Sequence, residues 1–256
     1  MKKFLFIAIL CVISVPFVMA ELTADQLLLK AVIVGDVKEL DKAIKAGANV
    51  NAKDEKGNVA LRLAAKSGGV GVVKLLMSNP NITIRLASKD HVTPFEEAVF
   101  YGKKDIIKLF IEGVDQIDKN GQKVGVSMIT PNERFRKDGK NALHMIVIYK
   151  QPEILEMLID RFLMAMTSRT NVEDYNADKE ANDYYNALKI FNSFGLNDVA
   201  EADKLTPLQM AEKLLKKTQN SKEQEKYKAM IKLLKNAEEK EEMMYSDFTA
   251  FSQEEK

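Results

Sequence analysis

Apolar residues recur along this chain every three to four positions, in short segments that come in pairs. The first members of the pairs cover residues 27–35, 60–68, 94–102, 142–150 and 206–211. The second members cover residues 37–46, 70–78, 104–112, 152–163 and 227–236. Glycines close the first segments at Gly35, Gly68 and Gly102, so the first three units repeat every 33 to 34 residues. The pattern predicts an all-α chain of about five helix pairs.

Residues at the ends of these segments are those that helix termini prefer. Thr93 and Thr206 each stand directly before a proline, so the threonine can cap a helix whose first residue needs no N–H donor. The closing glycines permit the left-handed backbone that reverses the chain. Small residues such as Ala64, Ala65 and Ala98 allow neighbouring helices to approach closely. Since one pair alone cannot bury its apolar stripe, we expect the pairs to stack into a solenoid with one continuous core.

Several short motifs resemble the ankyrin repeat. The family's Thr-Pro-Leu-His-x-Ala helix start is matched in part by Thr93-Pro94-Phe95, Asn141-Ala142-Leu143-His144 and Thr206-Pro207-Leu208. Its link to the next repeat is matched by Gly47-Ala48-Asn49-Val50-Asn51-Ala52, and its finger turn by Asp54-Glu55-Lys56-Gly57. The resemblance implies an ankyrin solenoid with short finger turns, and a function in binding other proteins.

The repeats predict how the chain is divided. An export signal is expected over residues 1–20, the repeat domain over 21–237 and a loose charged tail over 238–256. Repeats are expected near residues 24–52, 53–86, 87–118, 137–165 and 203–237. Insertions are expected over 114–136 and 165–202, the second with an extra short helix over 186–194, and a Lys- and Gln-rich insert over 216–226.

The first twenty residues have the layout of a secretory signal peptide. Lys2 and Lys3 precede an apolar run that Pro16 interrupts, and Ala20 ends a stretch of small residues at the expected cleavage point. A membrane anchor is the weaker alternative, because a spanning helix needs about 20 apolar residues. Cleavage would remove Cys11, the one cysteine, so packing alone must hold the mature chain together. We expect the periplasm, with full secretion as the alternative.

Composition excludes much of the chemistry that a chain of 256 residues could carry. The formal charge is only +1, so nothing favours nucleic acid or an anionic membrane, and two histidines with one cysteine are too few for most metal clusters. We therefore expect no cofactor, no metal and no enzyme.

Residues 116–121 are expected to form a surface turn rather than a calcium loop, and His144 a structural hydrogen bond. Glu96, Glu97 and the acidic run 238–242 are expected on solvated faces.

A candidate binding surface comes from the resemblance. In the ankyrin pattern, the two residues before the closing glycine of the first helix face the concave groove. Counting with that pattern, the predicted partner-binding residues on the helices are Ile33, Val34, Lys66, Phe100, Tyr101, Ile148 and Tyr149. Those on the finger turns are Glu55, Lys56, Lys89 and His91, with a further turn at 137–139. Two alternatives remain: the long insertions could cover the groove, or the helix register could be shifted by one residue.

These expectations combine into one functional hypothesis. The mature chain would be a monomeric periplasmic binding protein, which uses its apolar groove to cap the active site of a periplasmic enzyme. An inhibitor or immunity-type protein that protects the cell from its own hydrolase fits this description, with a peptidoglycan endopeptidase as the sharpest guess. A secreted effector that binds a host protein is the alternative, and an enzyme with its site in residues 165–202 is the weakest.

Overall fold

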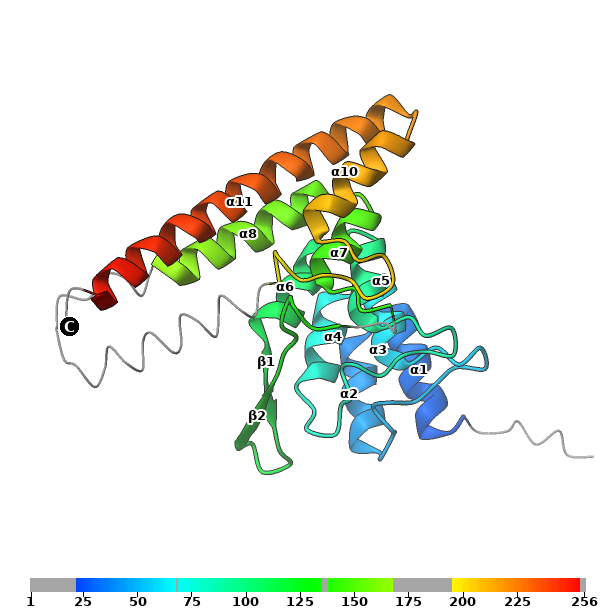
Figure 1. The fold of residues 1–256 in the computed structure, drawn as a ribbon. Coiled ribbons are helices and arrows are strands. Elements are labelled where there is room, and N and C mark those ends of the chain that lie inside the picture. The colour runs from blue at the N-terminus through cyan, green and yellow to red at the C-terminus, as the bar shows by residue number, and fades with distance from the viewer. Residues whose placement is uncertain (1–21, 68, 135–137, 168–194, 254–256) are drawn as a thin grey trace, which may run out of the picture.

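The computed structural model describes residues 22–67, 69–134, 138–167 and 195–253, and this part of the chain forms a stack of helix pairs (Figure 1). The first helices of the pairs are α1 (Ala24–Val34), α3 (Ala60–Ser67), α5 (Pro94–Phe100), α7 (Ala142–Ile148) and α10 (Pro207–Lys217). The second helices are α2 (Val37–Lys45), α4 (Val70–Met77), α6 (Lys104–Glu112), α8 (Pro152–Thr167) and α11 (Ser221–Gln253).

These helices form two layers. In the inner layer, α3 packs against α1 and α5, and α7 packs against α5 and α10. In the outer layer, α4 packs against α2 and α6, and α8 packs against α11. The predicted all-α solenoid of five helix pairs is confirmed for the described part of the chain.

Helix starts follow the predicted chemistry. The Thr93 side chain accepts a hydrogen bond from the backbone N–H of Glu96, and Pro94 occupies the first turn of α5. Thr206 caps α10 in the same way. Gly102 adopts the left-handed conformation after α5 with φ 64°, and Lys150 adopts it at the equivalent place after α7 with φ 57°. The chain reversal is therefore kept in the fourth unit although the glycine is not.

The core runs continuously through the stack. Ala64 and Ala98 are completely buried where the inner helices α3 and α5 meet. Phe95 of α5 meets Phe110 of α6 edge to face, with ring centroids 5.9 Å apart, and neither side chain is exposed. Small residues thus permit the close contact between repeats, and large ones fill the space within a repeat.

The first insertion forms a β-hairpin outside the inner layer. Strands β1 (Val114–Ile117) and β2 (Lys123–Ser127) pair antiparallel, and the Ile117 N–H donates to the carbonyl of Ser78 at 2.8 Å, just after α4. Figure 1 shows the hairpin beside α4, with which β1 is in contact. The Asp118 carboxylate accepts from the backbone N–H groups of Asn120 and Gln122, both at 2.8 Å, which confirms the predicted surface turn.

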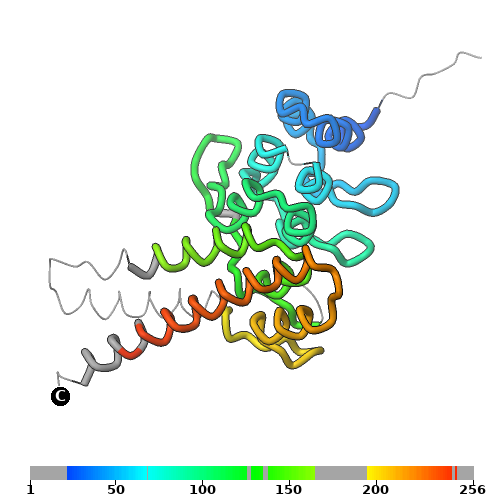
Figure 2. The backbone as a smooth tube through the Cα atoms, turned by 90° about the horizontal axis from the view of Figure 1, so that it is seen from above, coloured from blue at the N-terminus to red at the C-terminus, as the bar shows by residue number. Residues whose placement is uncertain are grey.

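The C-terminal unit differs most from its prediction. Helix α11 begins at Ser221 and runs for 33 residues, so it includes residues 227–236, much of the expected insert and most of the expected loose tail. The reason is packing, because Met230, Leu234 and Ala237 bury a stripe at helical spacing that continues to Glu241. Helices α8 and α11 lie side by side and extend past the rest of the stack (Figures 1 and 2).

Some predictions fall on residues that the structure does not describe. These are the signal over residues 1–20 with Cys11, the extra helix over 186–194, and Lys137 of the third finger turn. Among the described helices, none has the length and apolar character needed to cross a membrane.

Candidate protein-binding surface

The predicted binding residues of the inner helices reach one face of the stack, here called the inner face and defined as the solvent-exposed side of α1, α3, α5, α7 and α10. Ile33 and Val34 of α1 are 61% and 72% exposed, and Phe100 and Tyr101 at the end of α5 are 52% and 42% exposed. Lys66 of α3 lies exposed between them along the stack. Large apolar side chains are thus presented to solvent where the core does not need them.

Three aromatic rings form a cluster on this face, the aromatic patch of Phe100, Tyr101 and Tyr149. The Phe100 ring meets Tyr101 edge to face at 4.9 Å between centroids, and it meets Tyr149 in the same way at 5.1 Å. The Lys66 ammonium lies 5.5 Å from the centroid of the Tyr101 ring, within the range of a cation–π contact. The rings therefore hold one another in place before any partner arrives.

Residues of the fourth unit support this patch from below. Ile148 and Tyr149 are half-buried and pack against the core, so they are less available than Phe100 and Tyr101. The Tyr149 hydroxyl donates to Oε1 of Glu96 at 3.0 Å, which ties α7 to α5 beneath the Phe100 ring. A polar contact to a fully buried carboxylate fixes the ring orientation, and so limits what a partner must order on binding.

The prediction that Glu96 and Glu97 lie on a solvated face is wrong. Glu96 is fully buried and Glu97 is 6% exposed. Burial is possible because Arg62 of α3 donates from Nε to Glu97 at 2.9 Å, across the boundary between two repeats. The same guanidinium donates to Asp90 at 2.6 Å and to Asn58 at 3.0 Å. One cation therefore connects two inner helices and two finger turns. Sequence spacing gives no signal for this network, because its hydrogen-bonded pairs are up to 35 residues apart.

The acidic run 238–242 is also only partly on a solvated face. Glu239 and Glu242 are exposed, whereas Glu241 is buried at 5% exposure and accepts a hydrogen bond from the Asn197 amide at 2.9 Å. Burial, and then the neighbouring carboxylate of Glu238, raises the pKa of Glu241 to about 7. The polar residues of the run therefore lie on more than one side of α11.

Finger turns place the remaining predicted residues beside the inner helices. Glu55 and Lys56 are exposed at the tip of the first turn, and Lys89 and His91 are exposed on the second. The turns hold each other, because the Lys89 N–H donates to the carbonyl of Gly57 at 3.2 Å. His91 has a left-handed backbone with φ 64°, as the tip of a tight turn requires. No observation tests these residues as contacts, so that role remains a prediction.

The third finger turn is bound into the protein. Lys140 is nearly buried, and its ammonium lies 2.8 Å from the Asp138 carboxylate and 3.1 Å from that of Asp203. The Ala202 N–H donates to the carbonyl of Asp138 at 3.1 Å, so residues 200–205 pack against this turn. It offers fewer free groups to a partner than the first two turns do.

His144 has the structural role that the sequence indicates. The side chain is fully buried, with Nδ1 2.7 Å from the Asn141 amide oxygen and Nε2 2.9 Å from the carbonyl oxygen of Leu205. Burial lowers the pKa of His144, although the hydrogen bond to Leu205 acts in the opposite direction. The ring therefore links α7 to the segment that precedes α10.

The described residues of the first insertion, 114–134, do not cover the aromatic patch, because the hairpin docks beside α4 and Phe100 and Tyr101 stay exposed. The described end of the second insertion, residues 195–202, contacts Asn141 and Asp138 instead. The exposed positions also fit the predicted helix register, because Val99 next to Phe100 is fully buried.

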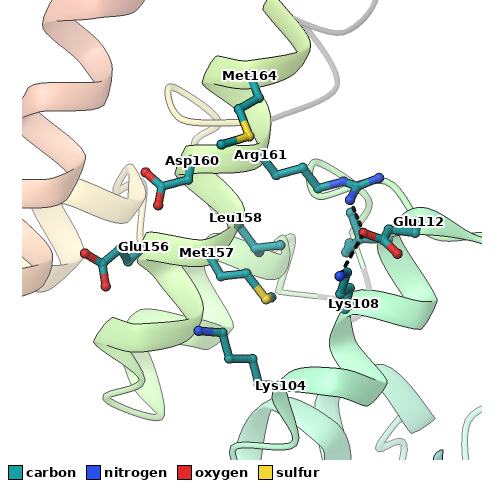
Figure 3. A pocket seen from close by; sticks show the side chains of 10 residues that line it. Lys104, Lys108, Glu112, Glu156, Met157, Leu158, Asp160, Arg161 and Met164 are labelled. Carbon is teal, nitrogen blue, oxygen red and sulfur yellow. Dashed lines mark hydrogen bonds and ion pairs between the residues drawn. The ribbon is translucent and has the colours of Figure 1, made fainter.

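A separate cleft of about 300 Å³ opens between α6 and α8, on the outer layer (Figure 3). Charged side chains line it and engage each other: Arg161 and Lys108 both approach the Glu112 carboxylate. Among the described residues, no group of three or more metal-ligating side chains is found.

Comparison with known proteins places the repeats independently. The family description "Ankyrin repeats (3 copies)" matches residues 28–123, a segment that begins within α1 and includes all of α2 to α6. Over 83 residues, 31% of this chain, the sequence is 30% identical to mouse "Rabankyrin-5". Over 119 residues, 46% of this chain, it is 29% identical to the chicken "Nuclear factor NF-kappa-B p105 subunit".

The matched segments correspond to only 7% and 11% of the length of those two relatives. The likeness therefore concerns the repeats and not the whole proteins. Sequence motifs, the stacked helix pairs and the family match agree with one another. Residues 28–123 of the chain are therefore ankyrin repeats, and ankyrin repeats are modules of protein–protein interaction.

Proposed function

We propose that the inner face is the binding surface of this module, and that its aromatic patch is the central anchor. The observation that carries the proposal is the exposure of Phe100 and Tyr101, which lie next to each other above a support of buried residues. Aromatic side chains bury a large area and have few rotatable bonds to order, so they dominate many interfaces. Truncation of each such anchor to alanine typically costs about 1–3 kcal/mol of binding free energy.

Beyond the binding activity, we propose that the partner is a periplasmic hydrolase of the producing cell. The proposal is that the mature chain caps the active-site cleft of this enzyme and inhibits it, as an immunity-type protein would. A peptidoglycan endopeptidase is the enzyme class we would test first. Support for the compartment comes from the signal-like pattern of residues 1–20. Support for a capping role comes from the rigid, exposed aromatic patch, which suits insertion into a cleft.

The proposal is tested by capture from the native periplasm, with the purified protein and a Phe100→Ala/Tyr101→Ala variant as the two baits. We choose this pair because both side chains are exposed, whereas Tyr149→Ala would remove a hydrogen bond from buried Glu96. The matched control is Val37→Ala/Val70→Ala, which removes two apolar side chains of similar exposure from the outer layer.

The expected result is one stoichiometric enzyme that the wild-type and control baits retain and the aromatic variant loses. Activity of that enzyme should fall when the wild-type protein is added. Equal capture by all three baits would contradict binding through the inner face. Capture of an enzyme without inhibition would contradict the capping role alone. Recovery of the protein from the culture medium or from host cells would favour the effector alternative.

A further inference from the structure

The charged residues of the inner helices are distributed unequally between acids and bases. Their sequences contain four carboxylates: Asp25, Glu96, Glu97 and Glu212. Asp25 accepts a hydrogen bond from the Asn49 N–H at 2.7 Å, and Glu212 pairs with Lys235 of α11 at 3.4 Å. Glu96 and Glu97 are buried. Each carboxylate of the inner layer is therefore buried or engaged inside the protein.

Lysines of the same helices are free by comparison. Five of them are exposed and form no ion pair within the described part of the chain, namely Lys30, Lys66, Lys213, Lys216 and Lys217. The chain as a whole is almost neutral at +1, so this excess of bases belongs to the inner layer and is not a property of the composition.

Two of these lysines lie in line with the aromatic patch. Phe100 is the seventh residue after its helix cap Thr93, and Lys213 is the seventh after its cap Thr206. Lys66 precedes Gly68 by two residues, as Phe100 precedes Gly102. The equivalent position therefore holds lysine in the second and fifth repeats and an apolar residue in the repeats between them. A basic residue stands on each side of the apolar centre.

Finger turns add charge of the same sign. Lys53, Lys56 and Lys89 are exposed on the first two turns. Asp90 forms an ion pair with Arg62, and Asp54 accepts hydrogen bonds from backbone N–H groups of its own turn. Glu55 is therefore the exposed acid at the tip that has no such partner within the described part of the chain. The edge of the inner face formed by the fingers is therefore also basic.

We infer that the partner presents an acidic polypeptide segment, in which an aromatic or large aliphatic side chain sits on Phe100 and Tyr101 and flanking carboxylates reach Lys66 and Lys213. The inference rests on the proposed binding function of the inner face and specifies the chemistry of its partner. Complementary charge increases the rate of encounter and fixes the direction in which the segment lies, while the aromatic contact supplies most of the affinity.

The test is selection of binders from a phage library of random twelve-residue peptides, panned on the purified full chain. Peptides rich in Asp and Glu around a Phe, Tyr, Trp, Leu or Ile are expected. A selected peptide, made synthetically with a fluorescent label, should bind Lys66→Glu/Lys213→Glu at least tenfold more weakly. Its affinity for the wild type should fall steeply as NaCl rises from 50 to 500 mM. Lys38→Glu/Lys74→Glu, on exposed lysines of the outer helices, is the matched control and should bind normally.

Several outcomes would overturn the inference. These are failure to select any peptide, selection of neutral or basic peptides, and unchanged affinity in the charge-reversed variant. Neutral peptides that are lost on Phe100→Ala/Tyr101→Ala would leave the proposed binding face intact and refute only its acidic specificity. Acidic peptides that this variant retains would refute the inner face itself. Self-association in sedimentation, if Lys66→Glu/Lys213→Glu abolishes it, would instead identify the occupant as the acidic part of α11 in a second copy.

Discussion

Glu241 allows a quantitative test of how α11 is held against the rest of the protein. This residue is 5% exposed, and its carboxylate accepts a hydrogen bond from the Asn197 amide. Burial raises its pKa most, the charge of Glu238 raises it further, the Asn197 hydrogen bond lowers it, and Glu242 raises it again. The resulting pKa is about 7, compared with an ordinary value of 4.5. The folded protein therefore holds a proton on Glu241 at pH values where the unfolded chain has already lost it.

The effect on stability has a definite sign. Between pH 4.5 and about 7 the folded state binds more protons than the unfolded state, so this residue makes the protein less stable as the pH rises. Above pH 7 the penalty is complete, and the interval of pKa corresponds to about 3 kcal/mol at about 1.36 kcal/mol per pKa unit. Glu241→Gln removes the charge but keeps an oxygen that can accept from Asn197. We expect a gain of about 2 kcal/mol at pH 8 and no gain at pH 4.5.

Thermal unfolding at pH 4.5, 6 and 8 measures this difference. A gain of about 2 kcal/mol should raise the Tm of Glu241→Gln by about 4–8 °C at pH 8. Glu239→Gln is the control, because Glu239 is exposed on the same helix and its loss should change the Tm little at any pH. A shift for Glu241→Gln that is the same at pH 4.5 and pH 8 would refute the reasoning. The pH dependence of stability that comes from His144 is the same in the wild type and in both variants, so it cancels when their Tm values are compared.

Two further stability predictions concern contacts between repeats. Arg62→Ala leaves Glu97 buried without its cation, so we expect the free energy of unfolding, measured in urea, to fall by about 3–5 kcal/mol. The control Arg134→Ala breaks an exposed ion pair with Glu201 and should lower it by less than about 1 kcal/mol. Similar losses for the two variants would contradict the buried network. In Gly139→Ala the backbone keeps φ 74° and the new Cβ would lie only 2.7 Å from the Glu201 backbone nitrogen, so we expect the free energy of unfolding to fall by about 2–4 kcal/mol. The control Gly121→Ala has φ 78° but no atom within 4 Å of the new Cβ, so it should lower the free energy of unfolding by only about 1–2 kcal/mol. Equal urea midpoints for the two variants would contradict a steric clash with Glu201.

The repeat architecture could be predicted because its signals are local. Helix caps at Thr93 and Thr206, and glycines at fixed spacing, depend on residues only a few positions apart. The expected exposure of Phe100 and Tyr101 came from the ankyrin resemblance, which places the two residues before the closing glycine on the groove side, and both are exposed. Wherever the interaction lies within one repeat, the sequence pattern was sufficient.

Contacts between repeats could not be predicted in this way. Glu96 and Glu97 have the composition of a solvated face, and only the positions of Tyr149 and Arg62 in neighbouring repeats show why they are buried. The length of α11 was missed for a similar reason, since Glu241 continues an apolar stripe only because Asn197 is there to satisfy it. A charged side chain can be buried when its partner is distant in sequence, and no period reveals that partner.

The turn of the β-hairpin has a practical consequence for work with living cells. Gly121 is exposed with open space around its Cα, and the hairpin that carries it docks beside α4, away from the inner face (Figure 1). An epitope tag or a small fluorescent reporter inserted between Asn120 and Gly121 would extend from the hairpin beside α4, which belongs to the outer layer and not to the helices that carry the aromatic patch. The protein could then be located and followed in the cell while its binding surface stays accessible.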